Sequence, residues 1–172
     1  AFFLFLLIMA PLKAEENSDE STIHDLTEQW TAAWNIGTGE FNAELFRTLF
    51  ASGENEIEVF DNVQGDVIVL RSIDEYIKAW KPFMEPLQSW SIEMSDLHIR
   101  VSGDLATTTF RLDGIDTRGP QGEEIPFGQY GTHVWKRYPT QGWRIVHEHL
   151  TSYDRREVAT KSEFTSIRSI DH

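Results

Sequence analysis

Two histidines near the end of the chain are the side chains best suited to chemistry in this sequence. His147 and His149 stand in the run Trp-Arg-Ile-Val-His-Glu-His-Leu, whose alternation predicts a β-strand. A regular strand would place both imidazoles on one face with Trp143 and Ile145, and Glu148 on the other. Imidazole transfers protons near neutral pH and also binds metals, but a third ligand for zinc is missing, so no metal is expected. Two interpretations stay open: contact with a ligand, or one buried, hydrogen-bonded histidine with the other at the rim of a cavity.

Asp61 is the candidate general base. It lies in residues 56–63, an alternating stretch that predicts a strand, and it shares the more apolar side with Ile57 and Val59. Desolvation on such a face raises the pKa of a carboxyl toward neutrality, which suits proton abstraction. The alternative is a strand-end carboxylate that caps a turn together with Asn62.

Hydrogen-bond donors and aromatic rings suited to a ligand lie in other parts of the chain. Tyr76, Tyr130 and Arg111 can donate to a developing oxyanion, although each also suits a structural role. The candidate aromatic contacts to a ligand are Trp34, Trp80 and Trp90. With Trp30 these tryptophans are also candidates for the core, and we expect one or two of the four to line a cavity.

Composition and missing motifs exclude several classes of protein. The 172 residues carry 15 Lys and Arg against 28 Asp and Glu, a net charge of −13 that repels phosphate backbones, so no nucleic-acid partner is expected. There is no cysteine, and therefore no disulfide or thiolate site. A phosphate-binding glycine loop, a Gly-x-Ser-x-Gly elbow and a His-Glu-x-x-His motif are all missing, so no cofactor is expected.

Two amphipathic helices should precede the first strand. The first begins at Ser21 or Thr22, carries a continuous apolar stripe and ends at Gly37. The second starts from Asn42 and is closed by the Ser52-Gly53 pair.

The rest of the pattern predicts a bent sheet. After the strand at 56–63 and a short apolar run at 67–70, a third helix starts at Ser72 and is stopped by Pro82 and Pro86. From residue 90 to residue 153 the pattern is typical of an antiparallel meander. Its apolar phase shifts once near Ser95-Asp96, which predicts a β-bulge with two residues opposing one. This order predicts an α+β fold: a cone-shaped, strongly curved antiparallel sheet around the N-terminal helices, with a cavity between helix and sheet.

The two ends of the chain differ from this domain in composition. The apolar run Phe2–Met9 and the polar residues 13–16 predict a truncated signal peptide at 1–14, hence a secreted or periplasmic chain with no membrane contact when mature; a buried N-terminal helix is the alternative. Residues 15–20 should be a mobile lead-in to a domain that spans 15–153. Residues 154–172 form a polar tail with a weak apolar face.

Four stretches resemble a known family. They are Val59-Phe60-Asp61, the Leu97-x-Ile-x-Val-x-Gly-Asp104 turn, Thr132-x-Val-Trp135-Lys136 and Gly142-Trp-Arg-Ile-Val-His-Glu-His-Leu-Thr151. Together, over residues 22–153, they resemble the SnoaL-like, ketosteroid-isomerase-like branch of the nuclear transport factor 2 superfamily, whose fold is cystatin-like. They are also similar to the association domain of calcium/calmodulin-dependent kinase II. His133, a further candidate ligand contact, replaces an arginine of that domain, and Tyr130 replaces an arginine frequent in SnoaL-like relatives, so the resemblance implies a neutral or aromatic ligand.

The expected function is binding of a small, mostly apolar molecule in the cone, with proton transfer if the protein is a cofactor-independent isomerase, cyclase or lyase. Asp61 would be the base, His147 or His149 its partner, and Tyr130 or Tyr76 the donor. We therefore expect Asp61 and His147 to face one shared cavity. The alternative is a non-catalytic binding or assembly module. In either case a homodimer through the open sheet face is expected, burying more than about 1,000 Å².

Overall fold

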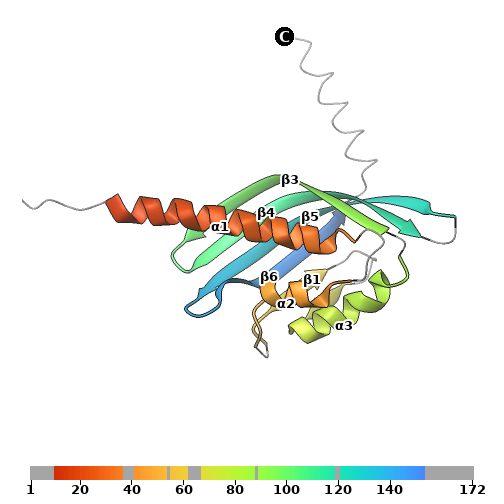
Figure 1. Cartoon of the computed structure of the whole chain (residues 1–172), viewed down its shortest axis with the longest axis horizontal. Coiled ribbons are helices and arrows are strands. Elements are labelled where there is room, and N and C mark those ends of the chain that lie inside the picture. Colours follow the sequence, from red (N-terminus) through yellow and green to blue (C-terminus); the bar gives the residue numbers. More distant parts are fainter. Residues whose placement is uncertain are drawn as a thin grey trace, which may run out of the picture.

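Three helices lie on the concave side of one curved sheet (Figure 1). The computed structural model describes residues 10–36, 41–53, 55–61, 67–87, 89–118 and 121–153. The helices are α1 (Ala10–Trp34), α2 (Ala43–Leu49) and α3 (Ile73–Met84). The strands are β1 (Glu58–Asp61), β2 (Ile68–Leu70), β3 (Ser89–Ser102), β4 (Leu105–Arg118), β5 (Glu123–Tyr138) and β6 (Gly142–Tyr153). The predicted α+β class and order of elements are confirmed.

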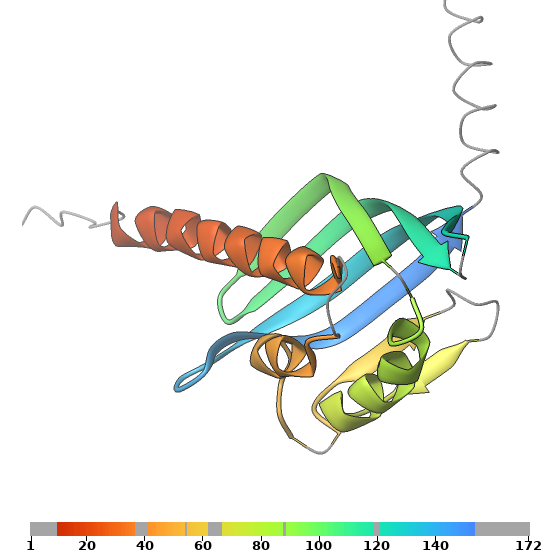
Figure 2. The same ribbon diagram turned by 45° about the vertical axis from the view of Figure 1, so that its right-hand side comes forward.

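The sheet has the strand order β2-β1-β6-β5-β4-β3. The long strands β3 to β6 form an antiparallel meander, and β1 joins its edge by pairing in parallel with β6. Figure 2 shows how the meander curls over α1 while α2 and α3 cover the end near β1. The inner face of the sheet is therefore covered by helices, and the outer face carries no described helix.

The predicted bulge in β3 is present. The pairing steps from Ser95 to His98 on β3 while β4 advances only from Arg111 to Thr109. Two β3 residues therefore oppose Phe110 alone, as the phase change in the apolar residues predicted. The bulge bends β3, and the bend lets the sheet follow the curvature of the helix layer.

The first helix is longer than its sequence predicted. α1 begins at Ala10, so the expectation of a mobile lead-in at 15–20 is wrong. The carboxylate of Asp19 accepts two hydrogen bonds from the Arg137 guanidinium, at 3.1 and 2.9 Å, and one from the Trp143 indole at 3.2 Å. These contacts with β5 and β6 hold the early turns of α1 on the sheet, which the local composition could not indicate. Residues 1–9 and 154–172 lie outside the described residues.

The other helices begin where their capping residues predicted. Asn42 accepts a hydrogen bond from the backbone of α2, and Ser72 does the same for α3. Pro82 does not stop α3 as expected, since it lies inside the helix, which continues to Met84. Proline near the end of a helix removes one backbone donor only, and Met84 is buried in the core, which favours the extra residues.

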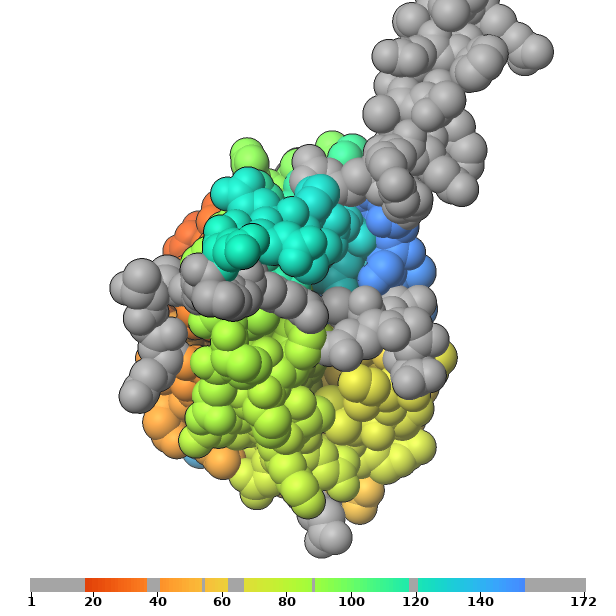
Figure 3. All heavy atoms as spheres, turned by 90° about the vertical axis from the view of Figure 1, so that its right-hand side faces the viewer, coloured from red at the N-terminus to blue at the C-terminus, as the bar shows by residue number. Residues whose placement is uncertain are grey.

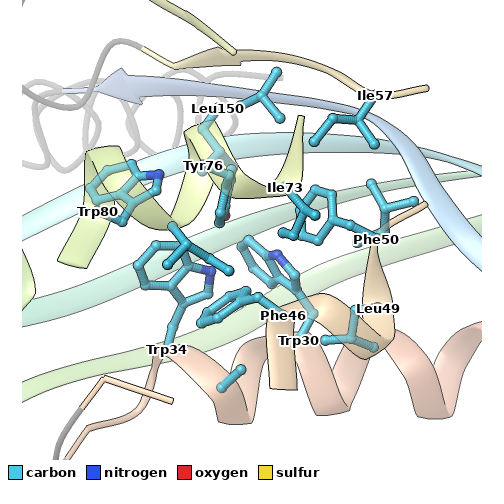
Figure 4. Packing of buried hydrophobic residues seen from close by; sticks show 14 of the residues in the cluster. Trp30, Trp34, Phe46, Leu49, Phe50, Ile57, Ile73, Tyr76, Trp80 and Leu150 are labelled. Carbon is cyan, nitrogen blue, oxygen red and sulfur yellow. The ribbon is translucent and has the colours of Figure 1, made fainter. Parts of the chain in front are cut away.

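Aromatic rings make up much of the core between the helices and the inner face of the sheet (Figure 4). Trp34 packs edge-on against Phe46 at 4.8 Å and Trp80 at 5.0 Å between ring centroids. Trp30 packs on Phe110 of β4 at 5.5 Å. Such contacts join α1 to both α3 and the sheet.

Among the described helices, none has the length and apolar character that a membrane span requires.

Candidate functional site

A small cavity lies between α1, α3 and the inner face of the sheet. Its volume is about 10 Å³, which holds about one water molecule. The residues that line it are Trp30, Trp34, Trp80, Trp90, Ile92, Leu112, Gln129 and Leu150. The wall is therefore aromatic and aliphatic, with the Gln129 amide and the indole N–H groups as its polar side-chain atoms.

All four tryptophans line this cavity, where the sequence predicted only one or two. Trp30 and Trp34 come from α1, Trp80 from α3 and Trp90 from β3. The three candidate aromatic contacts, Trp34, Trp80 and Trp90, are thus at the cavity. The helical spacing of Trp30 and Trp34 puts both on one face of α1, and their rings meet at 6.1 Å and 70°.

Three of the four indole N–H groups are buried without acceptors. Within the described part of the chain, Nε1 of Trp34, Trp80 and Trp90 has no hydrogen-bond partner, nor does Nε2 of Gln129. The Trp30 indole instead has the Tyr76 hydroxyl as its hydrogen-bonding neighbour. In Figure 4 the indole nitrogens of Trp34 and Trp80 face the interior on the side of Tyr76. Buried donors are normally paired, so several unmet donors at one cavity call for an explanation.

A fully buried polar cluster lies behind Trp30. The Tyr76 hydroxyl donates to Oε1 of Glu148 at 3.0 Å, and Nε2 of His133 lies 3.2 Å from Oε2 of the same carboxylate. The Tyr76, His133 and Glu148 side chains have no exposed surface. Burial raises the pKa of Tyr76 well above 10, and the negative charges of Glu148 and Asp61 raise it further. Tyr76 therefore stays protonated and donates its hydrogen bond.

Packed rings surround the imidazole of His133. Trp30, Phe110 and Trp135 lie 4.7, 4.8 and 5.6 Å from it, each roughly edge-to-face. His133 therefore faces the inner side of the sheet, as a predicted ligand contact would. It is not among the described residues that line the cavity, and its Nε2 is directed at Glu148.

The prediction that Asp61 and His147 share one cavity is wrong. Asp61 is buried on the inner face, where its register partner on β6 is Leu150. His147 and His149 lie on the outer face, where the ring of Phe60 is 5.5 and 6.3 Å from their imidazoles. The proton-transfer pairs of Asp61 with His147 or His149 are therefore not formed.

A second bulge explains this error. Trp135 pairs with Ile145 but Val134 pairs with His147, which leaves Val146 without a partner across the ladder. The alternation predicted for β6 reverses at that point, so Glu148 turns inward with Leu150. The sequence carried a weak signal for it, because apolar positions change from odd at Trp143 and Ile145 to even at Leu150.

The predicted donors Arg111 and Tyr130 lie on the outer face as well. Nε of Arg111 donates to the Tyr153 hydroxyl at 2.6 Å, and its guanidinium is 3.0 Å from the Asp113 carboxylate. The Tyr153 hydrogen bond raises the pKa of Arg111. Tyr130 stacks on Tyr153 at 4.9 Å. Both donors follow the strand alternation away from the cavity, so neither can reach a ligand in it.

The described residues contain no group of three or more His, Asp or Glu side chains placed to hold a metal ion. The sequence reasoning missed two buried polar side chains at or near the cavity: Glu148, which was assigned to the wrong face, and Gln129, which has no distinctive motif. Gln129 pairs in register with Leu112 and so shares its inner face.

Comparison with known proteins agrees with this architecture. A family model described as the SnoaL-like domain matches residues 23–153. No curated protein matches the chain. Solved structures do, at identities that establish the fold alone.

A nuclear transport factor 2-like superfamily protein from Salmonella enterica has a TM-score of 0.69 and 17% identity over 81% of this chain and 94% of its own. A Caulobacter vibrioides protein with a cystatin-like fold has a TM-score of 0.63 and 18% identity over 87% and 99%. A Xanthomonas campestris protein assigned as a calcium/calmodulin-dependent protein kinase II association domain has a TM-score of 0.59 and 16% identity over 78% and 87%. The nuclear transport factor 2-like, cystatin-like fold expected from the sequence is confirmed.

Proposed function

The chain belongs to the SnoaL-like domain family, and from that membership and the tryptophan-lined cavity we propose that the protein binds a small, mostly apolar molecule between α1, α3 and the sheet. The observation that carries the proposal is the set of unmet indole donors around the cavity. A core built only for stability would pair these donors or replace the tryptophans by hydrocarbon side chains.

The proposal is binding rather than proton transfer, because the described residues that line the cavity include no carboxylate or imidazole. Glu148 and His133 face each other behind Trp30, where their hydrogen bonds support the fold. Export of the protein, proposed from the apolar run at 2–9, concerns residues outside the described part of the chain.

A cavity of about 10 Å³ must widen to take a ligand larger than water. We place the opening at the end of α3, where the side chains that pack on the cavity wall are partly exposed. Phe83 packs on Trp90 and Trp90 on Phe127 there, with centroid distances of 5.8 and 4.4 Å. Phe83 and Phe127 are only partly buried. Figure 3 looks onto this end of the molecule, where α3 lies below the ends of β4 and β5.

Ethylbenzene titration tests the proposal. We expect saturable quenching or a shift of tryptophan fluorescence, because four of the six tryptophans line the cavity. Leu112→Phe fills the cavity and should weaken binding about 10-fold or more, since an added ring competes directly for the space. Thr107→Phe adds the same ring on the outer face of β4 and should leave binding unchanged. A lack of saturation with the wild type, or equal binding by Leu112→Phe, would refute the proposal.

Self-association through the outer face of the sheet is a second candidate function. No described helix covers it, and Tyr130, Val69 and Ile115 on it are 51%, 44% and 38% exposed. Pairing of two copies through this face would bury these side chains. The proposal agrees with a fold shared by a kinase association domain, and it does not compete with binding in the cavity.

Sedimentation velocity tests the assembly. We expect a dimer of the wild-type chain, and a shift to monomer for Tyr130→Glu, because burying an unpaired carboxylate in the interface is unfavourable. Thr140→Glu adds the same charge in the exposed β5–β6 turn and should leave the dimer intact. A wild-type protein that stays monomeric at high concentration would exclude this assembly.

A further inference from the structure

We propose that the cavity selects neutral molecules that carry hydrogen-bond acceptors and no donors, such as ketones, esters and ethers. This inference rests on the proposed binding function and names its ligand class. It depends on the polar atoms that the cavity wall presents, and on the charges that lie behind that wall.

The polar side-chain atoms of the described residues that line the cavity are mostly donors. An indole N–H donates and cannot accept a hydrogen bond. Trp34, Trp80 and Trp90 line the cavity and each carries one such group with no acceptor among the described residues, and the lining residue Gln129 adds a fourth unmet N–H. The Trp30 N–H already has the Tyr76 oxygen as its hydrogen-bonding neighbour. A ligand oxygen that accepts from any of these groups removes the penalty of a buried, unpaired donor.

The remaining tryptophans show that unmet indoles are a local property of the cavity. Trp135 donates to the Thr108 hydroxyl at 3.2 Å, and Trp143 donates to the Asp19 carboxylate at 3.2 Å. Both lie away from the cavity wall. The fold therefore pairs its indoles where no cavity is present.

A donor on the ligand would find little to bind. The carboxylate of Glu148 already accepts from Tyr76 and faces His133, and it is not among the described residues that line the cavity. Among the described side chains that do line it, only the Gln129 amide has an oxygen able to accept. A hydroxyl or amine on the ligand would thus be desolvated with at most one partner.

We expect both anionic and cationic ligands to bind poorly in this cavity. An anion would approach the buried carboxylates of Asp61 and Glu148, whose negative charge already acts on Tyr76. A cation would gain no hydrogen bond from the unmet N–H groups, because an indole N–H only donates and its hydrogen carries partial positive charge. A neutral acceptor is the class that satisfies the wall without either repulsion.

A matched series of ligands on the full chain tests the inference. The probes are acetophenone, 1-phenylethanol, ethylbenzene, benzoate and phenyltrimethylammonium, which share a phenyl ring and differ in polar group. We expect acetophenone to bind about 5- to 10-fold tighter than ethylbenzene, the gain of one net hydrogen bond. The alcohol should fall between them, and the two ions should bind more weakly than ethylbenzene.

The six indole N–H signals in ¹H–¹⁵N NMR spectra give a readout independent of affinity. Acetophenone should move one or more of the Trp34, Trp80 and Trp90 signals downfield, while those of Trp135 and Trp143 stay in place. Replacing the tryptophan that responds most by phenylalanine keeps a ring and removes the donor, so it should abolish the preference for acetophenone over ethylbenzene. Trp143→Phe is the matched control and should keep that preference.

The outcomes separate this inference from the proposed function. If none of the five probes binds, the proposed function itself fails. If ethylbenzene binds as tightly as acetophenone, or if benzoate or the ammonium ion binds best, the cavity binds ligands but the acceptor selectivity is wrong.

Discussion

Replacing Glu148 by alanine is expected to lower the free energy of unfolding by about 3–5 kcal/mol, because the change removes a buried carboxylate and leaves its two hydrogen-bonding partners unmet. The carboxylate is fully buried and is the hydrogen-bond partner of both Tyr76 and His133. Its loss leaves a phenol and an imidazole without partners in a site that water does not reach. Chemical denaturation followed by circular dichroism measures the change.

Glu148→Gln gives an intermediate case. The amide keeps one oxygen that can accept from Tyr76 or His133, so we expect a smaller loss, of about 1–3 kcal/mol. His149→Ala, one residue further along β6 and exposed, is the matched control and should change stability by less than about 0.5 kcal/mol. If Glu148→Ala proved no worse than His149→Ala, the inward orientation of Glu148 would be wrong.

Phe110→Ala should destabilise the protein by a similar amount, about 3–5 kcal/mol, because it removes a buried ring and leaves a cavity. Phe110 is 3% exposed and packs against Trp30 and His133 at centroid distances of 5.5 and 4.8 Å. Thr109→Ala removes an exposed side chain from the adjacent position on the other face, and should have little effect.

Gly131 supplies a second test of the same contact. A Cβ at Gly131 would lie 2.1 Å from Cε2 and 2.4 Å from Cζ of Phe110, so Gly131→Ala alone forces the ring aside and should cost about 1–3 kcal/mol. In the Phe110→Ala background the clash is absent and the same substitution should be nearly neutral. The two changes should therefore be strongly non-additive in a double-mutant cycle. Additive effects would contradict the close packing of Phe110 over Gly131.

Sequence patterns were sufficient to predict helices and strands where one face of the element is clearly apolar. The phase change in β3 was readable because three apolar residues lie on each side of it, and the order of helices and strands followed from capping residues and turns. The ends of helices were harder to predict from the sequence. The early turns of α1 are held by Asp19 through Arg137, a partner that lies far away in the sequence.

The candidate site was only partly predictable, and β6 shows why. Local alternation assigns a glutamate to the solvent face and lets a histidine lie on either face, so the pattern around Glu148 favoured the wrong orientation. Its inward position is stable because Tyr76 and His133 meet it from α3 and β5. The free energy of burying that carboxylate thus depends on groups that no local rule includes.

The sequence by itself determined the fold class, the bent meander and the presence of tryptophans at helical spacing, because these depend on hydrophobic periodicity and turn residues along the chain. Only the tertiary structure decided which side chains meet. A single extra residue at Val146 reverses the faces of β6 and moves both histidines away from Asp61. Three of the four indoles of the cavity lack acceptors among the described residues for the same reason: hydrogen-bond satisfaction is set by three-dimensional neighbours, which residue spacing does not encode.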